Sequence, residues 1–267
     1  MGNFVQHDNK LSPIVAYRER TMNVYQALIC GSGKGGRLGM GPKSHIVYRG
    51  KLLLEYVIES AIKAGINRIV VTMPSMSEYA RMSSQKVKLA AKIRKKYPKV
   101  FFIHDDNIRF RDKPDLVRDY LDLKRPFFIL GGHNPQSARF LRDLASLYKK
   151  NRLVMSAYRY KFDTYAILAV LKQNKVIDPI GKELIRPRVF RADVDRRVLL
   201  FPTVLDYSFY DHQVKSKNGP ALFQDWPKII IKNGGSVYAL DNPIPAEVDY
   251  KRDLPSLYSS IDYLFKK

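Results

Sequence analysis

Short apolar segments alternate with amphipathic helical segments through the first half of the chain, and this alternation constrains the fold more than any other feature of the sequence. The apolar segments are hydrophobic on both faces, which is typical of parallel strands covered by helices on both sides. We therefore predict an α/β fold, a three-layer sandwich around a mostly parallel, Rossmann-like sheet. The strands are expected at 24–30, 68–73, 100–103 and 127–130, and the helices at 51–64, 77–96 and 137–149.

The second half of the chain is less regular, and its elements are harder to assign. A final helix is indicated by Leu257, Ile261, Leu264 and Phe265, which share one face. The first 23 residues are polar and irregular, so we predict an N-terminal arm over 1–23 and a single domain over 24–267. The other expected elements are strands at 153–160, 198–210 and 236–240, and a helix at 220–232 that Pro227 interrupts.

The chain is strongly basic, with 47 Lys and Arg against 25 Asp and Glu and a formal net charge of +22. A field of this sign attracts phosphorylated small molecules, nucleic acids and acidic membranes. The largest local excess lies between Tyr79 and His104, where the sequence has no acidic residue. This segment predicts either a helix that follows a nucleic-acid or lipid backbone, or a solvated helix face, and we favour the solvated face.

The sequence shows neither a membrane-spanning apolar stretch nor a secretory leader. Its single cysteine, Cys30, lies within an apolar strand pattern, which indicates inert packing. One Cys and five dispersed His give no zinc-ligand spacing. These features favour a cytoplasmic protein.

A glycine-rich stretch, GSGKGGRLGMGPKS over residues 31–44, follows the first expected strand. It does not satisfy the P-loop pattern, because Pro42 stands where that pattern has glycine. Gly31, Gly33 and Gly36 match a dinucleotide-binding fingerprint, but the glycines and proline that follow oppose the helix that this fingerprint requires.

Bare main-chain N–H groups and two cations make the stretch suited to a triphosphate. Glycines let N–H groups approach phosphate closely, and Arg37 offers a planar fork for phosphate oxygens. Lys43, placed by Pro42, adds a point charge that can stabilise the charge developing during attack at phosphorus. We expect an NTP to bind Gly31, Ser32, Gly33, Gly35, Gly36, Arg37 and Lys43.

The stretch resembles the N-terminal motif of the GT-A-like nucleotidyltransferases, which reads L-A-G-G-x-G-T-R-L/M followed by P-K. The family includes sugar-1-phosphate nucleotidyltransferases, N-acetylglucosamine-1-phosphate uridylyltransferases and molybdenum-cofactor guanylyltransferases. Arg37 and Pro42-Lys43 occupy the Arg and P-K positions, and Gly36 stands for the usual Thr. The segment GKLLLEYVIESAIKAGINRIVV continues the likeness, which implies a GT-A nucleotidyltransferase fold.

The resemblance implies a reaction in which an acceptor phosphate oxygen attacks the α-phosphorus of an NTP and pyrophosphate leaves. It assigns Arg37 and Lys43 to catalysis, as groups that neutralise charge on the leaving pyrophosphate. It also implies a divalent metal, normally Mg²⁺, held by two aspartates. The acceptor is expected to be a sugar phosphate, and Asp206, Tyr207 and Tyr210 are candidates either for binding it or for a half-buried strand and turn.

The two expected metal positions match the family unequally. AEVDYKRDL resembles its C-terminal run and places Asp249 as a ligand, whereas Asp253 is expected to cap the last helix. In the turn FFILGGHNPQS, His133 occupies the position of the other aspartate. Since Mg²⁺ prefers carboxylate oxygen, His133 indicates a different metal, a compensating carboxylate such as Asp105 or Asp106, or a loop residue that binds no metal. The alternative function is therefore a non-catalytic nucleotide-binding or scaffold relative.

Overall fold

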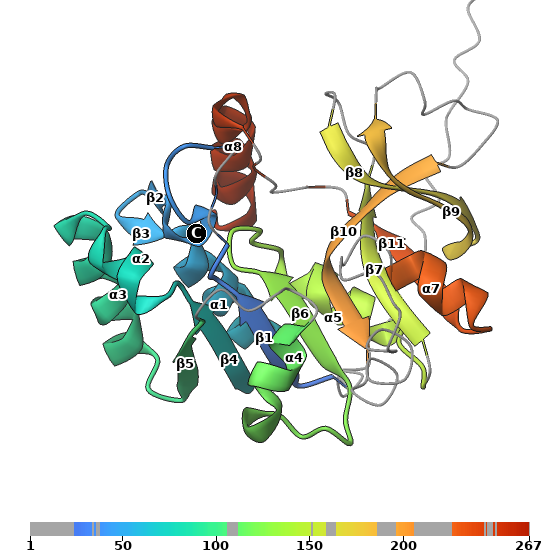
Figure 1. The fold of residues 1–267 in the computed structure, drawn as a ribbon, viewed down its shortest axis with the longest axis horizontal. Helices are drawn as coiled ribbons and strands as arrows, with labels where there is room; N and C mark the ends of the chain where they lie inside the picture. Colours follow the sequence, from blue (N-terminus) through green and yellow to red (C-terminus); the bar gives the residue numbers. More distant parts are fainter. Residues whose placement is uncertain are drawn as a thin grey trace, which may run out of the picture.

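The computed structural model of the chain describes residues 24–33, 35, 38–105, 112–150, 152–158, 164–185, 196–205, 226–242, 244, 248 and 250–266. The arm expected over 1–23 lies outside these residues, so the boundary at residue 24 stays a prediction. In the part of the chain that the structure describes, helices lie on both sides of one large sheet (Figure 1).

Four parallel strands form one half of this sheet. β1 lies between β4 and β6 and pairs in parallel with both, and β4 pairs in parallel with β5 at the edge. Each strand matches one that the apolar segments predict, within two residues at either end. In order across the sheet they are β5 (Val100–His104), β4 (Arg68–Met73), β1 (Gln26–Cys30) and β6 (Phe127–Gly131).

The other half of the sheet is mixed, so the prediction of a mostly parallel sheet is correct only for the first half. β10 (Arg196–Leu205) runs antiparallel to β6 on one side and to β7 (Arg152–Tyr158) on the other. β11 (Ser236–Asp241) is parallel to β7. The antiparallel β10 therefore separates two groups of parallel strands.

A hairpin that the sequence pattern did not predict completes the mixed half of the sheet, where one of its strands pairs with β10 and the other with β11. β8 (Thr164–Lys172) and β9 (Lys175–Ile185) are antiparallel and joined by Gln173 and Asn174. The φ values of these two residues are 50° and 65°, the left-handed conformation of a tight two-residue hairpin turn. Such a turn returns the chain at once, so it requires antiparallel pairing.

Helices bury alternate residues of the same strands on opposite faces. α1 (Leu53–Ala64) and α5 (Ala138–Ser146) pack on one face in a core that contains Ile29 and Val71. The neighbouring strand residues belong to the core of the opposite face, together with Trp226 of α7 (Trp226–Lys232). This alternation confirms the three layers. None of the described helices is long and apolar enough to cross a membrane.

Two of the predicted helices differ in detail from the structure. Residues 77–96 form two helices, α2 (Met76–Ala80) and α3 (Ser84–Lys96), separated at 81–83. The Ser75 hydroxyl caps α2 by accepting from the Glu78 N–H, whereas Ser83 occupies the N-cap position of α3 without a side-chain hydrogen bond. Pro227 lies in the first turn of α7, where its missing N–H costs no helical hydrogen bond. Within α7 Pro227 therefore does not interrupt the helix, and the part of the prediction over 220–225 lies outside the described residues.

The last helix, α8 (Leu254–Leu264), packs beside the outer end of the glycine-rich stretch. Leu257 and Ile261 share a buried cluster with Leu38 of the stretch. Tyr258 stacks on Tyr48, with ring centroids 4.2 Å apart, where β2 (Val47–Tyr48) and β3 (Lys51–Leu52) form a small second sheet. The C-terminal helix thus holds the region that follows the stretch.

Candidate functional site

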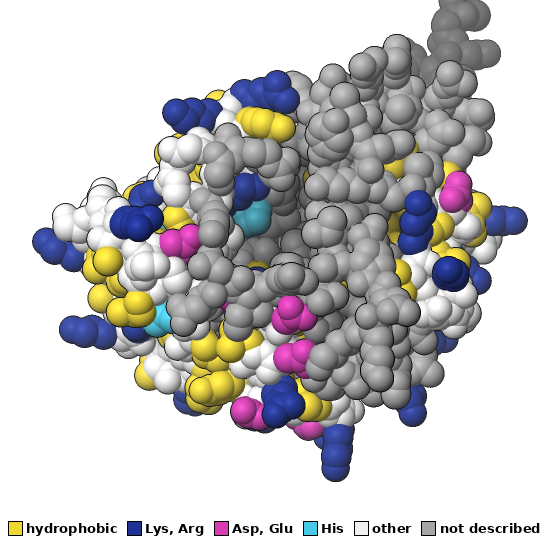
Figure 2. Space-filling model, in the orientation of Figure 1, with side chains coloured by type: hydrophobic (Ala, Val, Ile, Leu, Met, Phe, Trp, Pro, Cys, Tyr) yellow, Lys and Arg dark blue, Asp and Glu magenta, His cyan; other side chains and the backbone are white. Residues whose placement is uncertain are grey.

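The candidate site lies where the carboxyl ends of β1, β4 and β6 meet. Gly31 directly follows β1, and its N–H donates to the Thr72 carbonyl at 2.9 Å. Gly132 follows β6, and its N–H donates to the Cys30 carbonyl at 2.9 Å. Figure 2 shows that this face of the molecule is hollowed near its centre, above these strand ends. Open α/β sheets bind ligands at this edge.

Gly31 and Gly132 leave bare backbone at the strand ends because no side chain fits there. A Cβ on Gly31 would lie 2.6 Å from the Thr72 carbonyl oxygen. A Cβ on Gly132 would lie 2.9 Å from both the Cys30 carbonyl oxygen and the Gly31 Cα. The two glycines therefore let the ends of β1, β4 and β6 pack closely against one another, and the N–H groups of both are used within the protein.

A tight turn follows at Gly35, with a φ of +61°, and a Cβ there would collide with the Gly41 carbonyl. The Gly35 carbonyl accepts hydrogen bonds from the N–H groups of Leu38 and Gly39 at 3.0 and 3.2 Å. Only glycine tolerates both the positive φ at Gly35 and the close approach of the Gly41 carbonyl. Among the residues predicted to bind an NTP, Gly31, Ser32, Gly33, Gly35 and Lys43 are described, whereas Gly36 and Arg37 lie outside the described residues.

Lys43 is brought back to the end of β1 by its neighbour Ser44. The Ser44 hydroxyl donates to the Gly31 carbonyl at 2.5 Å, which ties the last residues of the stretch to the first. Lys43 begins the 3-10 turn η1 (Lys43–His45) after Pro42 and is half-buried. The structure thus places Lys43 beside Gly35 and next to a residue that is tied to Gly31, and its role in binding an NTP stays a prediction.

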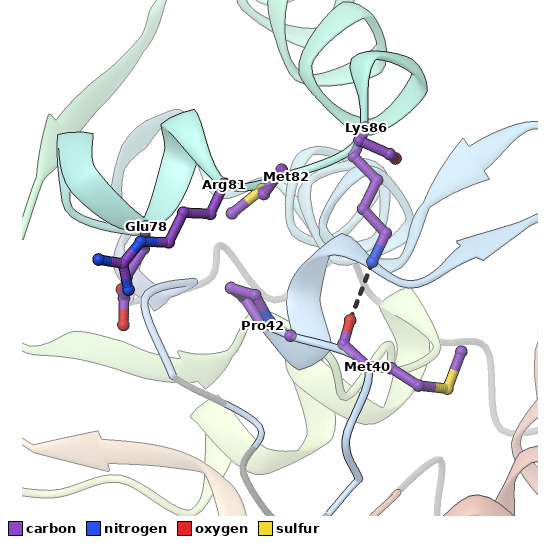
Figure 3. A pocket seen from close by; sticks show the side chains of 8 residues that line it. Met40, Pro42, Glu78, Arg81, Met82 and Lys86 are labelled. Carbon is purple, nitrogen blue, oxygen red and sulfur yellow. Dashed lines mark hydrogen bonds between the residues drawn. The ribbon is translucent and has the colours of Figure 1, made fainter.

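The outer side of the stretch is held by Lys86 of α3. Its ammonium donates to the Met40 carbonyl at 3.0 Å (Figure 3). Between this part of the stretch and helices α2 and α3 lies a pocket of about 360 Å³, whose lining includes Pro42, Glu78 and Arg81. Lys86 therefore fixes the backbone two residues before Pro42.

His45 is a buried neutral imidazole directly behind Lys43. The Ser44 hydroxyl gives its proton to Gly31, so His45 Nδ1, 2.8 Å from Ser44 Oγ, is the donor in that contact. Nε2 then carries a lone pair and has no hydrogen-bond partner. Burial, and secondarily the charge of Lys86, lowers the pKa of His45 to about 4.

The lowered pKa of His45 predicts a pH-dependent loss of stability. The unfolded chain binds a proton near pH 6.5, whereas the folded chain binds it only near pH 4, so protons favour unfolding between these values. We expect the free energy of unfolding to fall by about 3 kcal/mol as pH decreases through this window, and to be unaffected by His45 above it. Urea unfolding at a series of pH values measures this slope. The variant His45→Gln should lack that part of the slope, and a variant with the wild-type slope would contradict the assignment.

A buried ion pair, which the sequence pattern did not reveal, lies beside the start of the stretch. Lys113, the first residue of α4 (Lys113–Leu116), pairs with Asp105 at the end of β5. Their side chains are only 9% and 0% exposed. Ser32 Oγ donates to Asp105 Oδ2 at 2.6 Å and accepts from Lys113 Nζ at 2.7 Å. The pair therefore holds Ser32 in place.

Cys30 lies next to this pair and is chemically inert. Burial raises the pKa of its thiol to about 12, and the nearby charge of Lys113 offsets only part of this increase. A thiol with such a pKa stays protonated near neutral pH and is a poor nucleophile. This agrees with the packing role predicted from the sequence.

His133 lies in the turn after β6, half-buried, and a network of side-chain amides connects this turn to the C-terminal segment. Gln136 donates to the side-chain oxygen of Asn134 and accepts from Asn242 Nδ2 at 2.8 Å. Asn242 directly follows β11, and its N–H donates to the Ala157 carbonyl at 2.6 Å. The turn that contains His133 is thus linked to the beginning of the segment that leads to residue 249.

The described residues do not form a metal site by themselves. No three His, Cys, Asp or Glu side chains among them lie together as ligands. Asp105, expected as a compensating carboxylate, is already held by Lys113 and Ser32. Asp253 stands at the predicted N-cap position of α8, but its side chain makes no cap hydrogen bond to that helix. It accepts instead from the Tyr250 N–H at 2.8 Å and closes the 3-10 turn η6 (Lys251–Asp253) directly before α8. The predicted residues Asp106, Asp206, Tyr207, Tyr210 and Asp249 lie outside the described residues.

Comparisons with known proteins identify the fold. No protein-family model and no curated protein matches the sequence. The structure is similar to the inositol-1-phosphate CTP transferase from T. maritima, with a TM-score of 0.68 and 17% identity over 91% of this chain and 97% of that chain. It is also similar to the CTP:phosphocholine cytidylyltransferase from Streptococcus pneumoniae, with a TM-score of 0.62 and 19% identity over 88% and 97% of the two chains. A UDP-glucose pyrophosphorylase complexed with UDP-glucose gives a TM-score of 0.59 and 13% identity over 91% and 99%. The described chain therefore has the fold of these nucleotidyl-transferring proteins over nearly its whole length.

Proposed function

We propose that this chain is a nucleotidyltransferase that moves an NMP from an NTP to a phosphorylated acceptor and releases pyrophosphate. One observation carries the proposal: Ser44 ties the end of the glycine-rich stretch, and with it the neighbouring Lys43, to Gly31 at the carboxyl end of β1, in a fold shared with nucleotidyltransferases. This edge is where ligands bind in open α/β sheets. Main-chain N–H groups and a lysine at such an edge are suited to a polyphosphate.

The chemistry required of these residues is electrostatic. An acceptor phosphate oxygen forms a bond to the α-phosphorus, the bond to the bridging oxygen breaks, and that electron pair leaves with pyrophosphate. Lys43, together with Arg37, would stabilise the negative charge that accumulates on the leaving group.

The names of the similar structures suggest which base the nucleotide carries and which class of acceptor receives it. Their names specify CTP in two cases and UDP-glucose in the third, and the acceptors they name include inositol-1-phosphate and phosphocholine. We propose a pyrimidine NTP, and as acceptor a sugar phosphate or a related phosphomonoester.

A divalent cation is part of the proposal, with Asp249 and His133 as its protein ligands and the substrate phosphates as further ones. The amide network between the His133 turn and Asn242 supports this placement, because it holds the beginning of the C-terminal segment near that turn. The cation would neutralise phosphate charge. An imidazole ligand favours Mn²⁺ or another transition metal more than a pair of carboxylates does.

Pyrophosphate release tests the function directly. The full chain is incubated with each of the four common NTPs, with Mg²⁺ or Mn²⁺, and with sugar phosphates, inositol-1-phosphate or phosphocholine. We expect turnover with CTP or UTP and one acceptor, and loss of turnover on chelation. Absence of pyrophosphate with every combination would refute the proposed activity.

His133 favours one alternative, a relative that binds nucleotide without transferring it. Its imidazole stands where the resemblance implies an aspartate, and Asp105 is occupied by Lys113. NTP binding separates the alternatives, because a bound ligand raises the apparent thermal stability. A stability increase with an NTP, combined with no turnover, would identify the non-catalytic relative.

A further inference from the structure

The hydroxyl of Ser32, the second residue of the glycine-rich stretch, is held by three side chains from other elements. A serine hydroxyl has one proton to donate and two lone pairs to accept with. The proton goes to Asp105 Oδ2 at 2.6 Å, and one lone pair accepts from Lys113 Nζ at 2.7 Å. Because the Ser32 proton is used, Thr72 Oγ1, 3.3 Å away, is the donor in the third and weaker contact. The Ser32 hydroxyl is therefore fully engaged within the protein.

The main-chain N–H groups of Ser32 and Gly33, in contrast, are available to a ligand. They make no hydrogen bond to any described residue, whereas the N–H of Gly31 already donates to the Thr72 carbonyl. Gly33 is exposed, and a Cβ added to it would meet no atom of the described chain within 4 Å. Two adjacent N–H groups beside open space are suited to the oxygens of an anion.

The two charged partners of Ser32 are fixed on separate elements and are largely withdrawn from solvent. Asp105 follows β5, and its N–H donates to the Met73 carbonyl at 3.0 Å, while Lys113 begins α4 and donates to the Asp105 carboxylate. Their side chains are 0% and 9% exposed. A ligand at the strand ends can therefore sense this pair mainly through Ser32, which both of them contact.

We propose that Lys113 and Asp105 are positioning residues for the NTP: through the Ser32 hydroxyl they fix the main chain at Ser32 and Gly33, so that both N–H groups face the nucleotide. The inference rests on the proposed function, because it assigns these N–H groups to the NTP. Hydrogen bonds to charged groups are roughly twice as strong as neutral ones, and Ser32 makes one to each member of the pair. Stability alone does not require charges here, since apolar side chains of similar volume often replace a buried ion pair without loss.

NTP binding by the variant Asp105→Leu/Lys113→Met tests this inference. The double substitution removes both charges and both of their hydrogen bonds to Ser32, and it keeps most of the side-chain volume. An apparent Kd rises in inverse proportion to the fraction of chains in the binding geometry, so we expect the Kd for CTP or UTP to increase about ten-fold. Titration calorimetry measures this change. The KM for the NTP should rise by a similar factor with kcat nearly unchanged, because Ser44 anchors the residue beside Lys43 independently.

Ser32→Ala tests whether the pair acts through the Ser32 hydroxyl. Alone it should weaken NTP binding by the same factor, and combined with Asp105→Leu/Lys113→Met it should cause no further loss. Losses that multiply in the combined variant would overturn the inference. As a matched control, Ile230→Ala truncates a side chain of α7 that is 0% exposed, in the other half of the sheet, and should destabilise the protein without changing the Kd. An equal loss of affinity in this control would show a general effect of stability and would also overturn the inference.

Backbone ¹⁵N relaxation of the nucleotide-free chain separates this inference from the proposed function. Rigid backbone has an order parameter of about 0.85 and flexible backbone one below about 0.6. We expect the Ser32 N–H to be rigid in the wild type and to become flexible in Asp105→Leu/Lys113→Met. An unchanged order parameter would overturn the inference even if the wild type binds CTP or UTP. A decrease, combined with a wild type that binds no NTP, would instead refute the proposed function and with it the role of the pair in nucleotide binding.

Discussion

Replacing Lys43 by methionine is expected to lower kcat for nucleotidyl transfer by a hundred-fold to a thousand-fold. The magnitude is that of removing one preorganised group from a developing negative charge. Lys43 is preorganised because Pro42 precedes it and the Ser44 hydroxyl anchors the next residue to Gly31 at 2.5 Å. Methionine keeps most of the side-chain volume and removes the charge, so the change in kcat reports on the charge.

Two further variants test whether the loss of kcat comes from the charge of Lys43. Lys43→Arg keeps the charge and should restore part of kcat. Lys86→Met removes the hydrogen bond to the Met40 carbonyl, which acts on the stretch from outside, and should reduce kcat less than Lys43→Met does. Steady-state kinetics at several NTP concentrations separate kcat from KM, and thermal unfolding verifies that each variant is folded. If Lys43→Met retained wild-type kcat, the assignment of this lysine to the leaving group would be wrong.

The parallel half of the fold was predictable because strands buried on both faces are continuous apolar runs. Strand residues on both faces of the sheet are at most 2% exposed, among them Ile29, Val70, Val71 and Phe128. The β8–β9 hairpin was missed for a physical reason: Gln173 and Asn174 adopt left-handed backbone without the glycine that is typical of such a turn. The direction of β10 depends on its packing between β6 and β7, which no local pattern records.

The glycine-rich stretch could be predicted because glycine and lysine at these spacings are suited to binding phosphate. The pair of Lys113 and Asp105 was not. Its members are separated by residues 106–112, and both reach Ser32 only because β5, β4 and β1 are neighbours in the sheet. A carboxylate directly after a buried strand was the available signal for Asp105. Nothing in the sequence around Lys113 distinguishes it from the many other lysines.

Replacing Lys113 by methionine is expected to destabilise the protein by about 3–5 kcal/mol, because it leaves the Asp105 carboxylate buried without its cation. Water cannot compensate, since the Asp105 side chain is 0% exposed. Asp105→Asn should be destabilising as well, because it leaves the Lys113 ammonium buried. The free energy of unfolding in urea measures both changes.

The double variant decides whether this loss comes from the pair itself. Lys113→Met combined with Asp105→Asn removes both charges and keeps a side-chain acceptor for Ser32, so we expect it to recover at least half of the stability lost by the worse single variant. As a control, Arg49→Gln breaks an ion pair with Asp262 whose side chains are 67% and 32% exposed, and should have little effect because water screens it. Additive losses in the double variant would mean that the two charges do not interact in the folded chain. Recovery of stability without recovery of NTP binding would show that the charged pair also shapes the nucleotide site, because it positions Ser32 at the start of the glycine-rich stretch.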